Sequence, residues 1–104
     1  MLVLVVELEA NPAFCEELES MLRSMVDASG QEAGTIFYAA HRVPERNNVF
    51  VLYERYKDRA ALDMHLQSTV IQHALKRFET MLATPPKITF CETIATTALG
   101  QSCV

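Results

Sequence analysis

Residues 49–56 read Val-Phe-Val-Leu-Tyr-Glu-Arg-Tyr, a run rich in β-branched and aromatic side chains. Such residues favour a strand, in which successive side chains point to opposite faces. The run divides into Val49, Val51 and Tyr53 on one face and Phe50, Leu52, Glu54 and Tyr56 on the other. Both faces are apolar, so we expect this strand to lie in a sheet that is covered on both sides.

Three further strands are predicted around this run. Residues 35–43 have a similar composition and are joined to it by the turn-like residues 44–48, which predicts a hairpin. Residues 2–9 alternate apolar side chains with Glu7 and Glu9, and residues 88–94 alternate in the same way near the end of the chain. Together they predict four strands.

Three helices are predicted between these strands. The helix starts are Asn11-Pro12, Asp58, and Ser68 or Thr69, and the matching ends are Gly30, Leu66 and Pro85-Pro86. The resulting order is βαββααβ, which predicts an α+β fold of ferredoxin-like topology: a four-stranded antiparallel sheet with helices on one face. The uncovered apolar face then predicts a homodimer through sheet-to-sheet packing.

The size and charge of the chain exclude several functional classes. We expect one domain over residues 1–95 and a C-terminal tail over residues 96–104. A net charge of −4 without a basic stripe argues against nucleic-acid binding, and the apolar opening run is too short to cross a membrane. Cys15, Cys91 and Cys103 form no Cys-x-x-Cys pair, so we expect a cytoplasmic protein with reduced thiols and no metal site.

Residues 53–68, Tyr-Glu-Arg-Tyr-Lys-Asp-Arg-Ala-Ala-Leu-Asp-Met-His-Leu-Gln-Ser, resemble a segment of the antibiotic biosynthesis monooxygenase family. That segment combines a strand-end Glu, an acidic cap, an Ala-Leu pair and a His followed by Ser or Thr. Glu32-Ala33-Gly34 resembles the family's Glu-Pro-Gly-Cys turn, although Ala33 and Thr35 replace its proline and cysteine. The resemblance extends over nearly the whole chain.

The resemblance implies a dimeric α/β barrel in which each subunit holds a pocket between its sheet and its helices. Similar domains include quinol and anthrone oxygenases, haem-degrading enzymes, an isomerase of a phosphorylated signalling sugar and members without an assigned activity, so the fold alone does not fix the reaction. In the oxygenases an electron-rich, deprotonated substrate reduces dioxygen itself. The resemblance therefore implies no cofactor.

His65 and Glu54 are the catalytic residues that the sequence predicts. His65 lies three residues after Leu62, at the margin of the inward face of its helix, and Glu54 shares a strand face with Phe50 and Leu52. We expect His65 to act as a general base on a phenolic or enolic substrate, with Glu54 orienting it or fixing its protonation state. The alternative is a structural His65 that bonds Glu54 or a backbone carbonyl.

The predicted substrate contacts line an apolar cavity between sheet and helices. They are Tyr38, Phe50, Leu52, His73 and Phe78. Tyr38 is the strand tyrosine that we expect to donate a hydrogen bond to a substrate oxygen, whereas Tyr53 and Tyr56 serve packing. His73 either faces the cavity or lies on the surface. The cations Arg42, Arg55, Lys57 and Arg59 either select an anionic ligand or are solvated.

The function favoured by these residues is a cofactor-independent monooxygenase that acts on a small quinol-like aromatic substrate with dioxygen. Two alternatives remain open: an isomerase of a small phosphorylated or hydroxylated carbonyl compound that uses the same base, and a non-catalytic dimer that binds a small molecule. Haem chemistry ranks lower, because the Trp on which similar haem-degrading domains depend is absent from this chain.

Overall fold

The computed structural model describes residues 1–97 and confirms the predicted order of elements. The elements are β1 (Leu2–Glu9), a 3-10 turn (Pro12–Phe14), α1 (Cys15–Ser29), β2 (Thr35–Arg42), β3 (Val49–Tyr56), α2 (Arg59–Gln67), α3 (Thr69–Met81) and β4 (Lys87–Glu92). The last strand is shorter than predicted, since Ile94 lies beyond it and is 98% exposed. Most of the predicted tail, including Cys103, lies outside the described residues.

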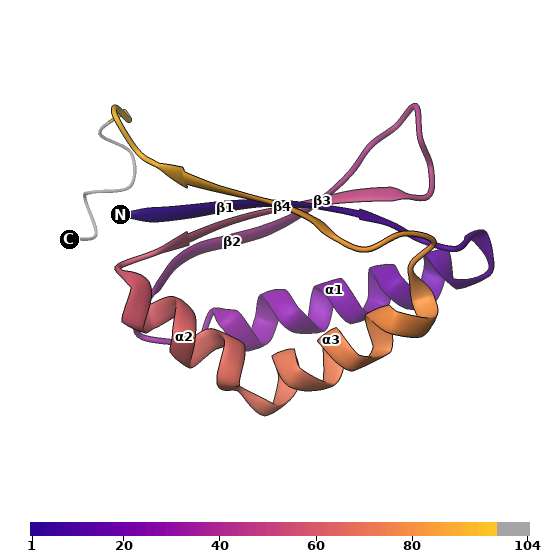
Figure 1. Ribbon diagram of the computed structural model, residues 1–104, viewed down its shortest axis with the longest axis horizontal. Helices are drawn as coiled ribbons and strands as arrows, with labels where there is room; N and C mark the ends of the chain where they lie inside the picture. The colour runs from indigo at the N-terminus through magenta and orange to yellow at the C-terminus, as the bar shows by residue number, and fades with distance from the viewer. Residues whose placement is uncertain (98–104) are drawn as a thin grey trace.

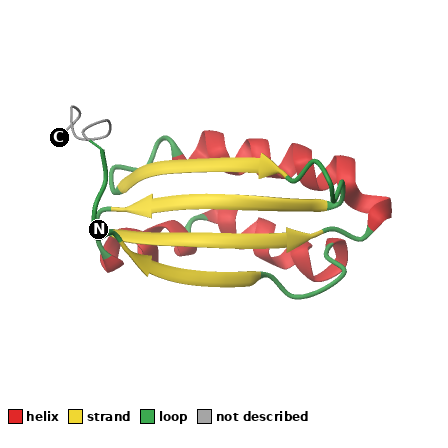
Figure 2. Ribbon diagram, turned by 90° about the horizontal axis from the view of Figure 1, so that it is seen from above, coloured by secondary structure: helices red, strands yellow, loops and turns green. Residues whose placement is uncertain are grey.

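The molecule has two layers, a sheet and three helices that all pack on one face of it (Figures 1 and 2). The strands are antiparallel in the order β2-β3-β1-β4, which confirms the ferredoxin-like α+β architecture. No helix within residues 1–97 is long and apolar enough to cross a bilayer.

Side-chain caps fix where the helical segments begin. The side chain of Asn11 accepts a hydrogen bond from the Ala13 amide at 3.1 Å, in front of the short 3-10 turn. Asp58 accepts from the Ala61 amide at 2.9 Å at the start of α2, and Ser68 accepts from the Ile71 amide at 3.3 Å at the start of α3. Each cap satisfies a backbone N–H that has no partner inside its own helix.

Strand register decides which side chains meet the helices. Leu4 of β1 pairs with Glu54 of β3, which pairs with Tyr38 of β2. Residues paired across antiparallel strands point to the same face, and Leu4 belongs to the core that also contains buried residues of all three helices. Glu54 and Tyr38 therefore lie on the helix side of the sheet.

The opposite face of the sheet is covered by no helix within the described residues (Figure 1). Phe37 on this face is 50% exposed, and its ring lies 5.9 Å from that of Tyr53 in an edge-to-face arrangement. On the helix side, the edge strand β4 is also uncovered, so Ile88 and Phe90 are 52% and 56% exposed.

Gly34 permits a close approach between the loop after α1 and the first turn of α2. A Cβ atom at Gly34 would lie only 2.4 Å from the Cβ of Ala61, a distance that real side chains do not adopt. The Gly34 carbonyl also accepts a hydrogen bond from the Lys57 amide at 2.9 Å. The missing side chain lets residues 31–34 pack directly on α2.

A Gly34→Ala variant is expected to unfold at a lower temperature, because the added methyl group forces the loop away from α2. Overpacking of this kind lowers the free energy of unfolding by about 1–3 kcal/mol. In a domain of this size each kcal/mol lowers the melting temperature by roughly 4–8 °C. Thermal unfolding followed by circular dichroism measures the loss.

The matched control is Gly30→Ala, since a Cβ at Gly30 would meet no atom closer than 3.5 Å. Adding Ala61→Gly to Gly34→Ala removes the clashing methyl group and should recover part of the loss. A Gly34→Ala protein as stable as the Gly30→Ala protein would contradict the packing role of Gly34.

Candidate functional site

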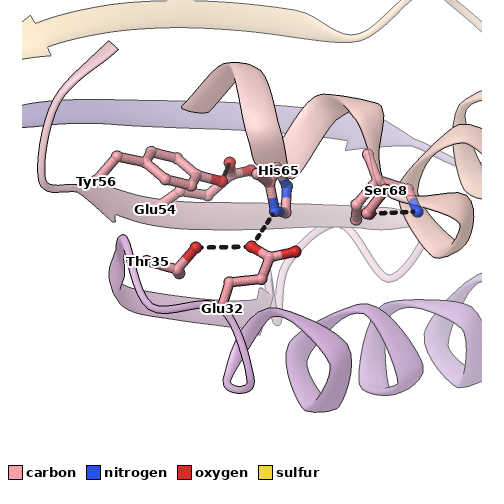
Figure 3. A network of polar contacts seen from close by, with 7 residues as sticks. Glu32, Thr35, Glu54, Tyr56, His65 and Ser68 are labelled. Atoms are coloured by element: carbon pink, nitrogen blue, oxygen red, sulfur yellow. Dashed lines mark hydrogen bonds and ion pairs between the residues drawn. The ribbon is translucent and has the colours of Figure 1, made fainter. Parts of the chain in front are cut away.

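His65 lies in the interior, where its partner is a carboxylate from the loop after α1. The imidazole is 3% exposed, and its Nδ1 donates a hydrogen bond to Oε1 of Glu32 at 2.9 Å (Figure 3). The same Glu32 oxygen accepts a hydrogen bond from the Thr35 hydroxyl at 2.7 Å. A carboxylate that accepts from Nδ1 fixes the tautomer with a free lone pair on Nε2, which is the arrangement of a general base.

Glu54 lies beside His65 but bonds a different group. Its Oε1 accepts a hydrogen bond from the Tyr56 hydroxyl at 2.6 Å. The predicted partnership is therefore corrected: Glu32, not Glu54, holds the imidazole. The physical reason is that the loop at Glu32 packs on α2 through Gly34, whereas the carboxyl group of Glu54 is taken by its near neighbour on β3.

Two tyrosine rings enclose the imidazole. The ring centroids of Tyr38 and Tyr56 lie 5.3 and 5.2 Å from that of His65. Burial raises the pKa of both phenols, and the negative charges of Glu54 and Glu32 raise them further. Both tyrosines therefore keep their protons over the physiological range and surround His65 with neutral rings.

The structure divides the predicted cavity into two hollows. His65 and Glu32 line the first, of about 630 Å³, between residues 31–34 and α2. Tyr38 and Phe50 line the second, of about 630 Å³, between α1 and β2. Tyr38 lines the second hollow and His65 lines the first, and the rings of these two residues are in contact.

Three predicted substrate contacts line neither hollow. Leu52 and Phe78 are buried in the hydrophobic core, and His73 is exposed on α3. The prediction that His73 contacts the substrate is not met. His73 comes directly before Ala74, whose side chain occupies the inward face of α3, so the His73 side chain is exposed.

The predicted cations have different surroundings. Lys57 lines the hollow of His65, and Arg42 lines the hollow between α1 and β2. Arg59 pairs with Asp63 at 3.1 Å on the surface of α2. Within residues 1–97 no three His, Cys, Asp or Glu side chains come close enough together to hold a metal ion.

Glu32 is a residue of the candidate site that the sequence does not predict. In the sequence it is only the first residue of the Glu-Ala-Gly turn. The signal that was available is an acidic residue two positions before a glycine that opens a strand. Such a carboxylate lies just before the start of a strand. The sequence alone does not show which residue it bonds, because that depends on how α2 packs.

Glu54→Gln is expected to raise the melting temperature at pH 7 and to leave it unchanged near pH 4. Burial raises the pKa of Glu54 above its ordinary value of 4.5, although the hydrogen bond from Tyr56 and the nearby His65 oppose the rise. The folded state thus binds this proton more tightly than the unfolded chain, so the stabilising contribution is complete below pH 4.5 and is lost as the pH rises through the folded-state pKa. A Gln side chain keeps the acceptor for Tyr56 without the buried charge.

The measurement is thermal unfolding of both proteins across this pH range, where each kcal/mol corresponds to roughly 4–8 °C. Glu79→Gln, at an exposed position of α3, is the matched control for loss of one carboxylate. A Glu54→Gln protein that is less stable than wild type at pH 7 would show that the ionised Glu54 stabilises the fold.

Comparison of the chain with known proteins identifies its family. The profile of the family described as antibiotic biosynthesis monooxygenase matches residues 1–77. The crystal structure of PA3566 from Pseudomonas aeruginosa has 30% sequence identity and a TM-score of 0.85, over 90% of this chain and 94% of that chain.

Two curated relatives are similar over most of this chain. The protein named "Putative monooxygenase YcnE" from Bacillus subtilis is 29% identical over 82% of this chain and 90% of its own length. An uncharacterized protein from Synechocystis sp. is 26% identical over 84% of this chain, and the match spans 59% of the length of that relative. This chain belongs to the antibiotic biosynthesis monooxygenase family.

Proposed function

We propose that this protein is a cofactor-independent monooxygenase of small quinol-like or anthrone-like aromatic compounds. The observation that carries the proposal is the buried His65, whose Nδ1 donates to Glu32 at 2.9 Å and whose ring lines a hollow of about 630 Å³. Membership of a family described by monooxygenase activity supports the reaction class.

His65 acts first, as the base. Its Nε2 takes the acidic proton of the bound substrate, and the Glu32 carboxylate stabilises the imidazolium that forms. The neutral rings of Tyr38 and Tyr56 shield the imidazole from water, which strengthens its attraction to the Glu32 carboxylate. The deprotonated substrate is then an electron-rich anion.

The anion supplies the electrons for oxygen activation. Transfer of electrons from the carbanion to dioxygen joins carbon to oxygen and gives a hydroperoxide after protonation. In an anthrone, loss of water then converts the reacting CH₂ group into a carbonyl, and in a quinol it converts the reacting ring C–H into the C–OH of a hydroxyquinone. In both cases one oxygen atom of dioxygen enters the product and the other leaves as water. No external reductant is needed, because the substrate carbon is itself oxidised.

The test is dioxygen consumption by the purified chain, without added cofactor, over a panel of quinols and anthrones. We expect uptake above the protein-free autoxidation rate, with one oxygenated product molecule formed per dioxygen consumed. Rates equal to autoxidation across the panel would remove the oxygenase proposal.

Isomerisation of a small phosphorylated carbonyl compound is the second candidate, favoured by one observation. Lys57 lines the same hollow as His65 and offers a cation for an anionic substrate. Such a reaction needs only enolisation by His65 and proceeds unchanged under nitrogen. Anaerobic turnover therefore separates it from the oxygenase.

The uncovered sheet face supports a homodimer with sheet-to-sheet packing. Phe37 is half exposed on this face and contacts Tyr53, and the partly buried Val5 and Val51 lie on the same face. An apolar sheet face of this kind is normally covered in a folded protein. Analytical ultracentrifugation tests the dimer, and a single species with the mass of one chain at micromolar concentration would contradict it.

A further inference from the structure

The groove between α1 and β2 is a second hollow, separate from the one that His65 lines. Its volume of about 630 Å³ lies in the range of small-molecule sites. Leu22 and Val26 of α1 line one wall, Ala40 of β2 lines the other, and Phe50 and Tyr38 contribute aromatic surface. The small side chain at Ala40 leaves space at the edge of the sheet. An apolar molecule with one or two aromatic rings matches this lining.

One end of the groove carries a carboxylate held between two guanidinium groups. Arg23 donates to Oε2 of Glu19 at 2.8 Å, and Arg42 donates to the other oxygen, Oε1. These hydrogen bonds lower the pKa of Glu19, so its carboxylate is ionised at neutral pH. Two cations and one anion leave a positive charge at this end.

Glu19 shows how an anion would bind to the two arginines. Both guanidinium groups are well exposed, with 75% of the Arg23 side chain and 54% of the Arg42 side chain accessible to solvent. Exposed ion pairs of this kind contribute little to stability, so Glu19 can give way to the carboxylate of a ligand. The ligand then gains the apolar surface of the groove as well.

The acidic residue Asp27 lines the other end of the groove. It lies two turns after Glu19 on α1, about 12 Å along the helix axis. Its negative charge disfavours an anion at that end, next to Tyr38. The groove thus has a cationic end and an acidic end, which would orient an elongated ligand with its anionic group at Arg42.

We propose that the groove between α1 and β2 binds small aromatic carboxylates or sulfonates, with the anionic group on Arg42 in place of Glu19 and the rings against Val26, Tyr38 and Phe50. This binding does not depend on whether His65 acts as a base. It adds a second ligand site to the proposed function and can fail independently of it.

The experiment is a fluorescence titration of the full chain with 1-anilinonaphthalene-8-sulfonate, an aromatic anion. N-phenyl-1-naphthylamine has the same ring system without the charge and is titrated in parallel. Arg42→Gln should weaken binding of the anionic dye about tenfold, the loss expected for one charge-assisted hydrogen bond. Glu19→Gln should strengthen it, because the competing carboxylate is gone. Neither change should alter binding of the neutral dye.

Three further variants tie the signal to the groove. Arg46→Gln removes an exposed arginine that pairs with Glu7 and Glu9 outside the groove, and it is the matched control for loss of charge. Ala40→Leu fills the groove and should weaken both dyes. Arg42→Lys retains the positive charge and should keep part of the affinity. Because the Arg42 side chain is exposed, we expect the Gln and the Lys variants both to fold.

The proposal is overturned if Arg42→Gln and Glu19→Gln change the affinity for the anionic dye no more than Arg46→Gln does. Unchanged binding of both dyes to the Ala40→Leu protein also overturns it, and places the dyes on another surface such as the uncovered sheet face. His65→Asn should leave dye binding unaltered. A change of oxygen uptake in that variant therefore tests only the proposed function and not the groove.

Discussion

Replacing His65 by alanine is expected to lower the catalysed rate of dioxygen consumption by about 10²–10⁴-fold, the usual contribution of a general base. The reason is that His65 supplies the basic nitrogen of the proposed site, while Glu32 holds its other nitrogen at 2.9 Å. Oxygen-electrode rates, corrected for autoxidation, measure the effect. Added imidazole should restore part of the rate in the His65→Ala protein, because the deleted ring leaves space beside Glu32.

His65→Asn is the matched variant that keeps the fold. An Asn side chain can still donate to Glu32 from its amide nitrogen, but it has no basic atom to replace Nε2. We expect it to melt close to wild type and to be as inactive as His65→Ala. The control is His73→Asn, an exposed histidine on α3, which should retain full activity.

A folded His65→Asn protein with the wild-type rate would remove His65 as the base. The buried pair of His65 and Glu32 would then be structural. A structural role predicts that His65→Ala loses much of its thermal stability but none of its activity.

Glu32→Gln is expected to lower kcat about 10–100-fold, the usual effect of losing a residue that orients a functional histidine. The amide oxygen of Gln can still accept from Nδ1, so the ring keeps its position, but the counter-charge for the imidazolium is lost. The KM should change far less than kcat. A purely structural role for Glu32 would instead lower the thermal stability without this specific loss of kcat.

Thr35→Val provides a graded comparison at the same carboxylate. It removes the hydroxyl that donates to Glu32 at 2.7 Å while it leaves the charge in place. We expect a smaller loss of kcat than in Glu32→Gln. Equal kcat values in wild type and Glu32→Gln would show that Glu32 does not stabilise the charged imidazole.

Both variants affect a pairing that joins residues 33 positions apart. Local periodicity put Glu54 on the strand face of Phe50 and Leu52 and put His65 near the inward face of its helix. Whether that strand face meets the helices or the dimer interface stayed open in the sequence, and the strand register places it on the helix side. Neither pattern carries information about the loop at Glu32. That loop reaches α2 because Gly34 has no side chain to hold it away from Ala61.

The sequence by itself determined the order of the elements, the caps at Asp58 and Ser68 and the two faces of β3. These features follow from periods of two and of 3.6 residues and from hydrogen bonds within a few residues, so they are written locally. Only the tertiary structure decided that Glu32 bonds His65, that Tyr38 lines a separate hollow and that His73 faces solvent. Those outcomes depend on how a loop and three helices pack on one sheet, and contacts between distant segments are fixed by the shape of the whole interior.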